Sequence, residues 1–244
     1  MANNLRSIWD ADPDAAPKER SSFSDDIVGR FRSGRQVNGI PEALSNWRVT
    51  TGDPEVAAGI VELLGGVSEE WETDKEDNLQ VLTDAPTVRI VIEPDTLDAS
   101  FKQFVPGVGM THHCDGFAFL SPEEDKGKAC KCPTLIAERK NEASKGRGPK
   151  PSVDVTFRLT DAYDLGKFRF NSGSWKLVEV LGPLFAELDK YGDQQVEATL
   201  TIENVTYTPQ KGPRAGQEVS YNKPVIKILR AYEAAGTADL AKAA

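Results

Sequence analysis

The residues best suited to chemistry are three cysteines and two histidines, which all lie in the segment 112–132. Two pairs have the same i, i+2 spacing: His112 with Cys114, and Cys130 with Cys132. Zinc prefers four nitrogen or sulfur ligands in a tetrahedron. Because residues i and i+2 of an extended segment point to the same face, each pair can supply two ligands. The spacing predicts a structural Zn²⁺ site, closed by four protein ligands and without an open position for water.

The same residues allow other arrangements. A bulge could turn His113 toward the cysteines, so His113 is an alternative ligand to His112. The three cysteines could also be reduced and unliganded, or two of them could form a disulfide within a hairpin. Catalysis by a Cys–His pair is disfavoured, because the sequence shows no acid placed to orient the base beside a cysteine.

Composition limits the class of protein. The chain has 244 residues, 39% of them hydrophobic, and a formal net charge of -9. With three cysteines, no apolar core of a signal peptide and no run of about 18 apolar residues, we expect a soluble intracellular protein with no membrane partner. The acidic balance disfavours binding of duplex DNA by the whole surface, since phosphate contacts need clustered Lys and Arg.

The charge is distributed unevenly. Residues 126–150 contain eight Lys or Arg side chains against two Glu side chains, a net charge of +6. Such a run is typical of a solvated loop or of a patch that binds a protein or nucleic acid. Its candidate contact residues are Arg139, Lys140 and Arg147. Trp71 is a further candidate, because it lies in an acidic run (69–77) that either is a solvated face or meets a basic partner or a metal.

The ends of the chain differ from its centre in composition. Residues 1–25 are rich in Asp, Pro and Ser, which predicts a disordered N-terminal arm. Within the arm, Leu5, Ile8 and Trp9 have helical i, i+3, i+4 spacing and could dock on a partner or on the chain's own domain. Residues 26–233 are expected to form a single α+β globular unit, and the Ala-rich residues 234–244 a frayed tail.

In the first half, the sequence predicts one helix and one strand. Asp53 can cap a helix whose first turn accepts Pro54, an apolar stripe runs to Leu64, and the glycines at 65 and 66 end it. Residues 88–92 alternate as a strand that Pro94 is expected to end. Residues 121–152 are predicted to be a long loop or insertion around the metal site, and the metal-loop insertion as a whole is expected at about 111–150.

The second half predicts several strands and one helical region. Strands are expected at 153–159, 168–170, 196–202 and 225–229, with a bulge near Asn204. Ser174 is expected to cap a helix that Pro183 kinks or divides. The absence of a βαβ rhythm favours an α+β fold: a mixed, largely antiparallel sheet with a few packed helices and a zinc-stabilised loop insertion.

Motifs for common reactions are missing from the sequence. It contains no phosphate-binding loop and no dinucleotide fingerprint, and no paired carboxylates stand out from its acidic surface. Ser172 and Ser174 are better explained by helix capping than by nucleophilic catalysis. We therefore expect a protein that is not an enzyme.

Several stretches together resemble a known family. They are residues 47–66, 70–83 and 168–175, together with Cys114-Asp115-Gly116 and Cys130-Lys131-Cys132. In these the chain resembles the recombination directionality factors of actinobacterial temperate phages, the accessory proteins of large serine integrases, over about residues 27–181. Members of that family often have further cysteines near this cluster. Their absence from residues 144–149 leaves His112 or His113 as the substitute ligand.

The resemblance implies a function without catalysis. The integrase alone joins phage and bacterial attachment sites, and with this factor bound it favours prophage excision. The factor is expected to contact the integrase at or near its coiled-coil arm, and DNA only through the integrase. The alternative is a zinc-stabilised single-strand nucleic-acid-binding protein of phage replication, using the basic run with Phe117 and Phe119. Metal-dependent hydrolysis is disfavoured, since no open coordination position is evident.

Overall fold

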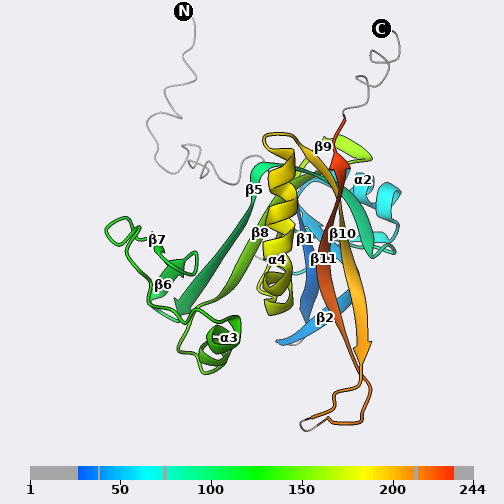
Figure 1. The fold of residues 1–244 in the computed structure, drawn as a ribbon. Helices are drawn as coiled ribbons and strands as arrows, with labels where there is room; N and C mark the ends of the chain where they lie inside the picture. Colours follow the sequence, from blue (N-terminus) through cyan, green and yellow to red (C-terminus); the bar gives the residue numbers. More distant parts are fainter. Residues whose placement is uncertain (1–26, 38, 74–75, 212–213, 234–244) are drawn as a thin grey trace, which may run out of the picture.

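A computed structural model describes residues 27–37, 39–73, 76–211 and 214–233. The described strands form one eleven-stranded sheet that curls around a core (Figure 1). The strands are β1 (Ile27–Val37), β2 (Ile40–Thr51), β3 (Val67–Glu70), β4 (Leu79–Leu82), β5 (Thr87–Val105), β6 (Gly109–Cys114), β7 (Phe119–Ser121), β8 (Lys150–Leu159), β9 (Ala162–Ser172), β10 (Val196–Tyr207) and β11 (Val219–Ala231). The helices are α2 (Pro54–Leu64), α3 (Ile136–Ser144), α4 (Trp175–Leu188) and a short 3₁₀ turn (Asp189–Tyr191).

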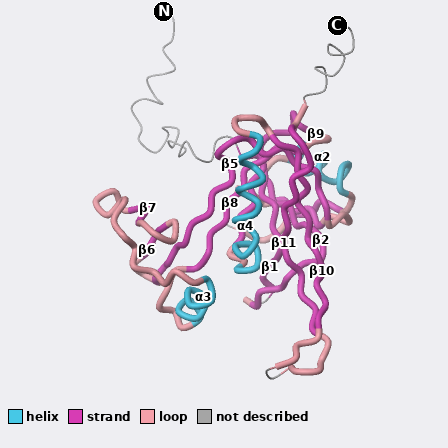
Figure 2. The backbone as a smooth tube through the Cα atoms, viewed as in Figure 1, coloured by secondary structure: helices cyan, strands magenta, loops and turns pink. Residues whose placement is uncertain are grey.

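The sheet has the strand order β11-β10-β5-β8-β9-β1-β2-β4-β3, with β6 and β7 continuing from the far end of β5. All pairings between the named strands are antiparallel except that of β1 with β9, which is parallel. The predicted α+β class and the mixed, largely antiparallel sheet are confirmed. Figure 2 shows how strands dominate over helices along the backbone.

The core lies inside the curl of the sheet. Five aromatic side chains pack edge to face or stacked at its centre, each at most 1% exposed: Phe31, Trp47, Phe157, Phe168 and Phe170. Helix α2 adds Val56, Ala57, Ile60 and Leu64, and α4 adds Leu177, Leu181 and Leu184. Since each large buried side chain stabilises the fold by about 1.5–3 kcal/mol, this cluster is sufficient to hold the sheet and both helices together.

The two helices with clear sequence signals form where expected. The Asp53 carboxylate accepts a hydrogen bond from the Glu55 N–H at 2.8 Å, and α2 ends at Gly65, whose φ of 71° favours glycine. Ser174 caps α4, as predicted. Pro183 was predicted to kink or divide this helix. It does not divide it: α4 is one helix from Trp175 to Leu188, with the proline inside it.

Two details of the strands were predicted wrongly. Pro94 does not end its strand: β5 continues to Val105, with an irregularity in its pairing to β8 between Ile92 and Leu97. A proline is tolerated at such an irregularity, because no ladder hydrogen bond is required there. The expected bulge near Asn204 is also absent.

Asn204 instead pairs directly with Asn222, and the irregularity of β10 lies at Glu197 and Ala198. The hydrophobic pattern of β10 slips after Ile202, because the ribbon it forms with β11 runs beyond the core there and its residues become exposed. Loss of core contact, and not an extra residue, explains the change in pattern.

The predicted metal-loop insertion is more ordered than a loop. Residues 103–149, which we term the metal lobe, contain β6, β7 and α3, and lie at the end of β5 and β8 away from α2 (Figure 1). The hydrophobic core includes no residue of the metal lobe. Something other than a large apolar core must therefore stabilise this lobe.

The two ends of the chain and its possible membrane segments were also subjects of prediction. The N-terminal arm with Leu5, Ile8 and Trp9, and the C-terminal tail, lie outside the described residues. In the described ranges, no helix is long and apolar enough to cross a membrane.

Candidate metal centre

The four ligands predicted from the sequence come together in the metal lobe. Nε2 of His112 and Sγ of Cys114, Cys130 and Cys132 all lie within 4.8 Å of one another. The distance between His112 Nε2 and Cys132 Sγ is 3.4 Å. A tetrahedral site with metal–ligand distances of about 2.0–2.3 Å has ligand atoms about 3.4–3.8 Å apart. A small contraction of the cluster around an ion would satisfy this geometry.

The backbone explains how the two pairs meet. His112 and Cys114 occupy alternate positions of β6, so both side chains point to one face, as predicted. The second pair is not extended: Lys131, between the two cysteines, has a φ of 58°, in the left-handed region. A non-glycine residue in this conformation is strained, and such strain is found mostly where a site requires it. The left-handed conformation of Lys131 turns the chain so that the thiols of Cys130 and Cys132 both reach the cluster.

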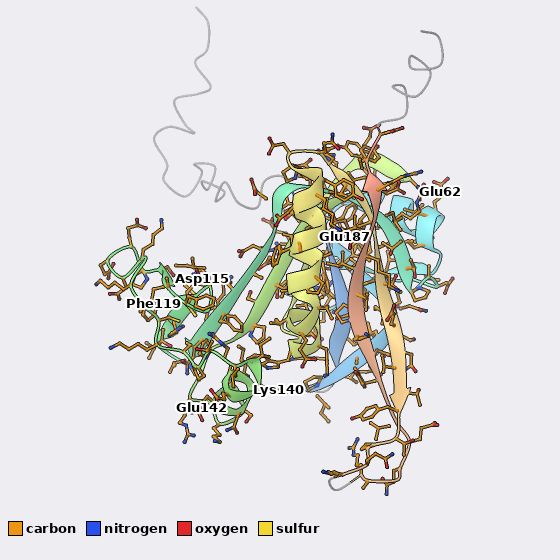
Figure 3. The ribbon with its side chains drawn as sticks, viewed as in Figure 1. Glu62, Asp115, Phe119, Lys140, Glu142 and Glu187 are labelled. Atoms are coloured by element: carbon orange, nitrogen blue, oxygen red, sulfur yellow. The ribbon has the colours of Figure 1, made fainter. Side chains whose placement is uncertain are left out.

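Hydrogen bonds hold the connecting loop. The Asp115 carboxylate accepts from the backbone N–H groups of Phe117 and Ala118 at 2.7 and 2.8 Å, and the Cys130 N–H donates to the Phe117 carbonyl at 2.9 Å. The labelled side chains of Asp115 and Phe119 lie on this part of the lobe (Figure 3). These bonds tie the loop after β6 to the segment that carries Cys130.

The alternative ligand His113 points elsewhere. Its Nδ1 lies 2.9 Å from the Ser121 hydroxyl, and it belongs to the opposite face of β6. The ring of His112, in contrast, packs on Phe119 with 4.7 Å between ring centres. Among the described residues, His112 is therefore the histidine that completes the cluster.

The protonation of the cluster suits a cation. Burial, and then the positive charges of His113 and Arg139, lower the pKa of His112, so its imidazole is neutral at pH 7 and can act as a ligand. Burial raises the pKa of the Cys114 thiol to about 12 and also raises that of Cys132. Without an ion these groups remain thiols, whereas a bound metal converts them to thiolates.

Arg139 is the functional residue whose role the sequence analysis missed. It was a candidate partner contact, but it is only 7% exposed. Its guanidinium donates to the Gly116 carbonyl at 2.5 Å and lies 4.9 Å from the centre of the Phe101 ring. Burial lowers the pKa of His112, and the charge of Arg139 adds to this effect; burial raises the pKa of Cys132, and the charge of Arg139 opposes this only in part. No periodic pattern marks this residue, since α3 is a short and mostly polar helix.

One buried atom of Arg139 gives an independent test of the donor set. Its Nη1 is buried and has no hydrogen-bond partner among the described residues. An ion such as Zn²⁺ bound by three thiolates and one imidazole carries one net negative charge. A buried guanidinium beside such a centre would be compensated by it, as outer-shell groups usually are. The residues present therefore fit a closed, structural metal site with three sulfur ligands and one nitrogen ligand.

The other candidate partner residues are scattered. Trp71 lies under the Arg48 guanidinium, which is 4.3 Å from its ring centre. On α3, Lys140 is exposed (Figure 3), whereas Arg147, just beyond the helix, is paired with Glu142 at 2.9 Å. Three more cations of the basic run are also paired: Lys126 with Glu123, Lys128 with Asp125 and Lys145 with Glu142. The run is therefore less available to an anionic partner than its sequence implied.

The comparison with known protein families gives one match that covers most of the chain. A family model described as "Gp3-like: Recombination directionality factor-like" matches residues 28–228. The match includes the whole metal cluster and almost the entire sheet. No solved structure matches the chain. The chain belongs to the Gp3-like, recombination directionality factor-like family.

Proposed function

We propose that this protein binds a phage serine integrase and switches it from integration to prophage excision, without catalysing a reaction itself. The observation that carries the proposal is the family match over residues 28–228. The contact is expected at or near the coiled-coil arm of the integrase, so that DNA is reached only through it. On this proposal the protein works in the cytoplasm of the bacterial host of a temperate phage.

The surface of the metal lobe supports a protein partner. Seven of the thirteen large hydrophobic side chains that are exposed among the described residues lie in this one lobe. They are Phe104, Val105, Val108, Met110, Phe117, Leu135 and Ile136. Phe104 and Met110 face each other across β5 and β6, and Val108 lies in the turn that joins these strands. Exposed apolar groups that gather in this way are typical of a surface that a partner covers.

The metal cluster supplies rigidity to this surface. We propose that Zn²⁺ is held by His112, Cys114, Cys130 and Cys132, and that it cross-links β6 to the loop before α3. When bound, the ion would supply a structural cross-link and a positive charge, but no open coordination position for a reactant. Arg139 would hold the adjoining turn at Gly116 in place and balance the charge of the thiolates.

The energetic requirement follows from the proposed switch. Moving a two-state equilibrium from 1:99 to 99:1 requires a ligand to bind one state more tightly by about 5.5 kcal/mol. A fully buried Phe, Val or Met side chain contributes about 1.5–3 kcal/mol. Two to four side chains of the metal lobe that are buried in only one of the two integrase assemblies would provide this difference.

The single-strand nucleic-acid-binding alternative gains less support. It requires free cations in the basic run, but four of the eight are paired with carboxylates and Arg139 is buried. Phe117 is exposed and could stack on a base, whereas Phe119 packs on His112. No described feature of this region favours nucleic acid over protein.

Recombination of the hybrid attachment sites by the cognate integrase tests the proposal. We expect excision only when the factor is added, together with inhibition of integration. Phe117→Ser and Val108→Ser should reduce excision at least tenfold. Val180→Ser and Leu229→Ser, which replace exposed apolar side chains outside the lobe, should not.

The same proteins allow binding to be measured directly. An integrase that lacks its coiled-coil arm should no longer bind the factor. Unchanged recombination in both directions with the cognate integrase would reject the proposed function, and equal effects of the lobe variants and their controls would reject the assignment of the surface.

A further inference from the structure

A pair of arginines on the β1–β2 ribbon has no role in the metal centre. Arg32 and Arg48 are directly opposite each other in the antiparallel register, so their side chains emerge on the same face. Like charges in directly opposed positions destabilise a sheet. The fold therefore places two positive charges together where two neutral side chains would be more stable.

Each guanidinium is fixed through its Nε atom. Arg48 Nε donates to the Gln80 side-chain oxygen at 2.5 Å, and its guanidinium lies over the Trp71 ring. Trp71 is itself anchored, since its indole N–H donates to the Asp77 carbonyl at 2.7 Å. Arg32 Nε donates to the Thr50 hydroxyl at 3.2 Å. The terminal nitrogens of both arginines are thus oriented but make no hydrogen bond with any described residue.

Neither arginine forms an ion pair with a described carboxylate, and the more distant Asp77 and Glu69 raise the pKa of Arg32 and Arg48, respectively, by less than burial lowers it. Three arginines nearby are each in an ion pair: Arg30 with Asp77, Arg35 with Glu42, and Arg169 with Asp154. Arg32 and Arg48 form no such pair within the described ranges, and Glu69 reaches Arg48 only through Gln80.

The absence of a directly paired carboxylate is costly at this position. Arg48 is only 8% exposed, so its charge is largely removed from water. Burial, followed by the neighbouring charges of Arg32 and Arg35, lowers the pKa of Arg48. Burial and then Arg30 lower the pKa of Arg32. Both guanidiniums would be stabilised by an anion.

The two arginines open onto the same cavity. They line an open pocket of about 1040 Å³, together with Trp71 and Gln80. The rim contains apolar groups at the end of the ribbon, Val37 and Pro41. Planar guanidiniums held in a fixed orientation match the two oxygens of a carboxylate or phosphate.

We propose that Arg32 and Arg48 form a binding site for a carboxylate of a protein partner. A polyphosphate is disfavoured, because Glu42 and Glu72 also line the pocket and would repel a chain of phosphates. A single carboxylate, carried by a peptide with apolar neighbours, meets both the guanidiniums and the apolar rim. This site goes beyond the proposed function and does not require that the partner be an integrase.

Calorimetric titration of the full chain with short peptides tests the site. The probes are the acetylated and amidated pentapeptides Ala-Leu-Glu-Leu-Ala and Ala-Leu-Gln-Leu-Ala, with a ten-nucleotide oligothymidylate as the phosphate probe. We expect the Glu peptide to bind at least tenfold more tightly than the Gln peptide. Arg32→Gln and Arg48→Lys should each reduce this preference to less than threefold, since a lysine keeps the charge but lacks the planar pair of donors.

Arg35→Gln is the matched control, because Arg35 lines the same pocket but is paired with Glu42. It should keep the full preference for the Glu peptide. Circular dichroism establishes whether each variant is folded. If Arg48→Lys does not fold, the result with Arg32→Gln alone decides the test. Equal binding of the two peptides, or a preference that survives Arg32→Gln, would overturn the proposal. Binding of oligothymidylate alone, lost in Arg32→Gln, would assign the site to nucleic acid instead.

Discussion

Removing the metal should unfold the metal lobe and leave the rest of the molecule folded. The perturbations are a zinc chelator and the substitution His112→Ala. The main hydrophobic core contains no residue of the lobe, and within the lobe the buried apolar side chains besides Cys114 and Cys130 are those of Ala143 and Pro149. Without the ion, little remains to offset the conformational entropy of the connecting loop, which is about 1–2 kcal/mol for each ordered residue.

The magnitude follows from linkage between binding and folding. With about 10 μM free Zn²⁺ and a dissociation constant of about 1 nM, binding stabilises the folded lobe by about 5.5 kcal/mol. Since about 1.4 kcal/mol is a factor of ten, the protection of lobe amides against hydrogen exchange should fall by about four orders of magnitude on chelation.

Hydrogen exchange followed by mass spectrometry reports the two regions separately. Protected lobe amides include those of Asp115, Phe119 and Cys130, which donate to backbone carbonyls within the lobe. The reference amides are those of Val155 and Phe157 in β8, whose side chains lie in the main core. We expect chelation to remove the protection of the lobe amides against exchange. The exchange rates of the β8 amides should change by less than tenfold.

A matched pair of histidine variants provides the control. His112→Ala should reproduce the effect of the chelator, whereas His113→Ala should retain one metal ion per chain in native mass spectrometry. Two results would refute the reasoning: a lobe that keeps its protection after complete removal of metal, or a His113→Ala variant that loses the ion while His112→Ala keeps it.

The apparent affinity for Zn²⁺ should rise at least about 100-fold between pH 6.5 and 7.5. Cys114 and Cys132, whose pKa values are raised, each release a proton on binding, whereas the lowered pKa of His112 leaves it neutral in this range. Competition with a chromophoric chelator measures this, and a flat profile would contradict it. Gly66→Ala should lower the free energy of unfolding by about 3 kcal/mol or more, because its φ is 90° and a Cβ would overlap the Leu82 carbonyl. Urea unfolding should show a loss of only about 1 kcal/mol for Gly107→Ala, where the φ is similar but the space is open, and equal losses would refute the steric argument.

The parts of the fold that the sequence predicted depend on local chemistry. Helix α2 needed only a cap at Asp53 and a glycine stop at Gly65, and both act within one turn. The four ligands were predictable because alternation along β6 and the clustering of Cys and His are both visible in the sequence. These signals do not require knowledge of what packs against them.

The parts that were missed depend on contacts between distant segments. The left-handed Lys131 has no signal in its own residue type, and it lies between two members of a cluster whose other half lies on β6. Pro94 was expected to end a strand, but the irregular pairing with β8 accommodates it. Arg139 looked like a free surface charge, because neither Gly116 nor Phe101 could be placed beside it from sequence.

The position of the metal lobe connects its stability to the proposed switch. A surface that discriminates between two integrase assemblies must keep its shape, because a flexible surface adapts to both and loses the difference in affinity. An apolar core large enough to give that rigidity would draw in the same side chains that have to remain exposed for the partner, among them Phe104, Val108 and Phe117. A metal cross-link would avoid this conflict, since four small ligands would hold the lobe while its apolar side chains stay at the surface. On this reasoning, loss of the ion should abolish the change of direction before it abolishes binding to the integrase.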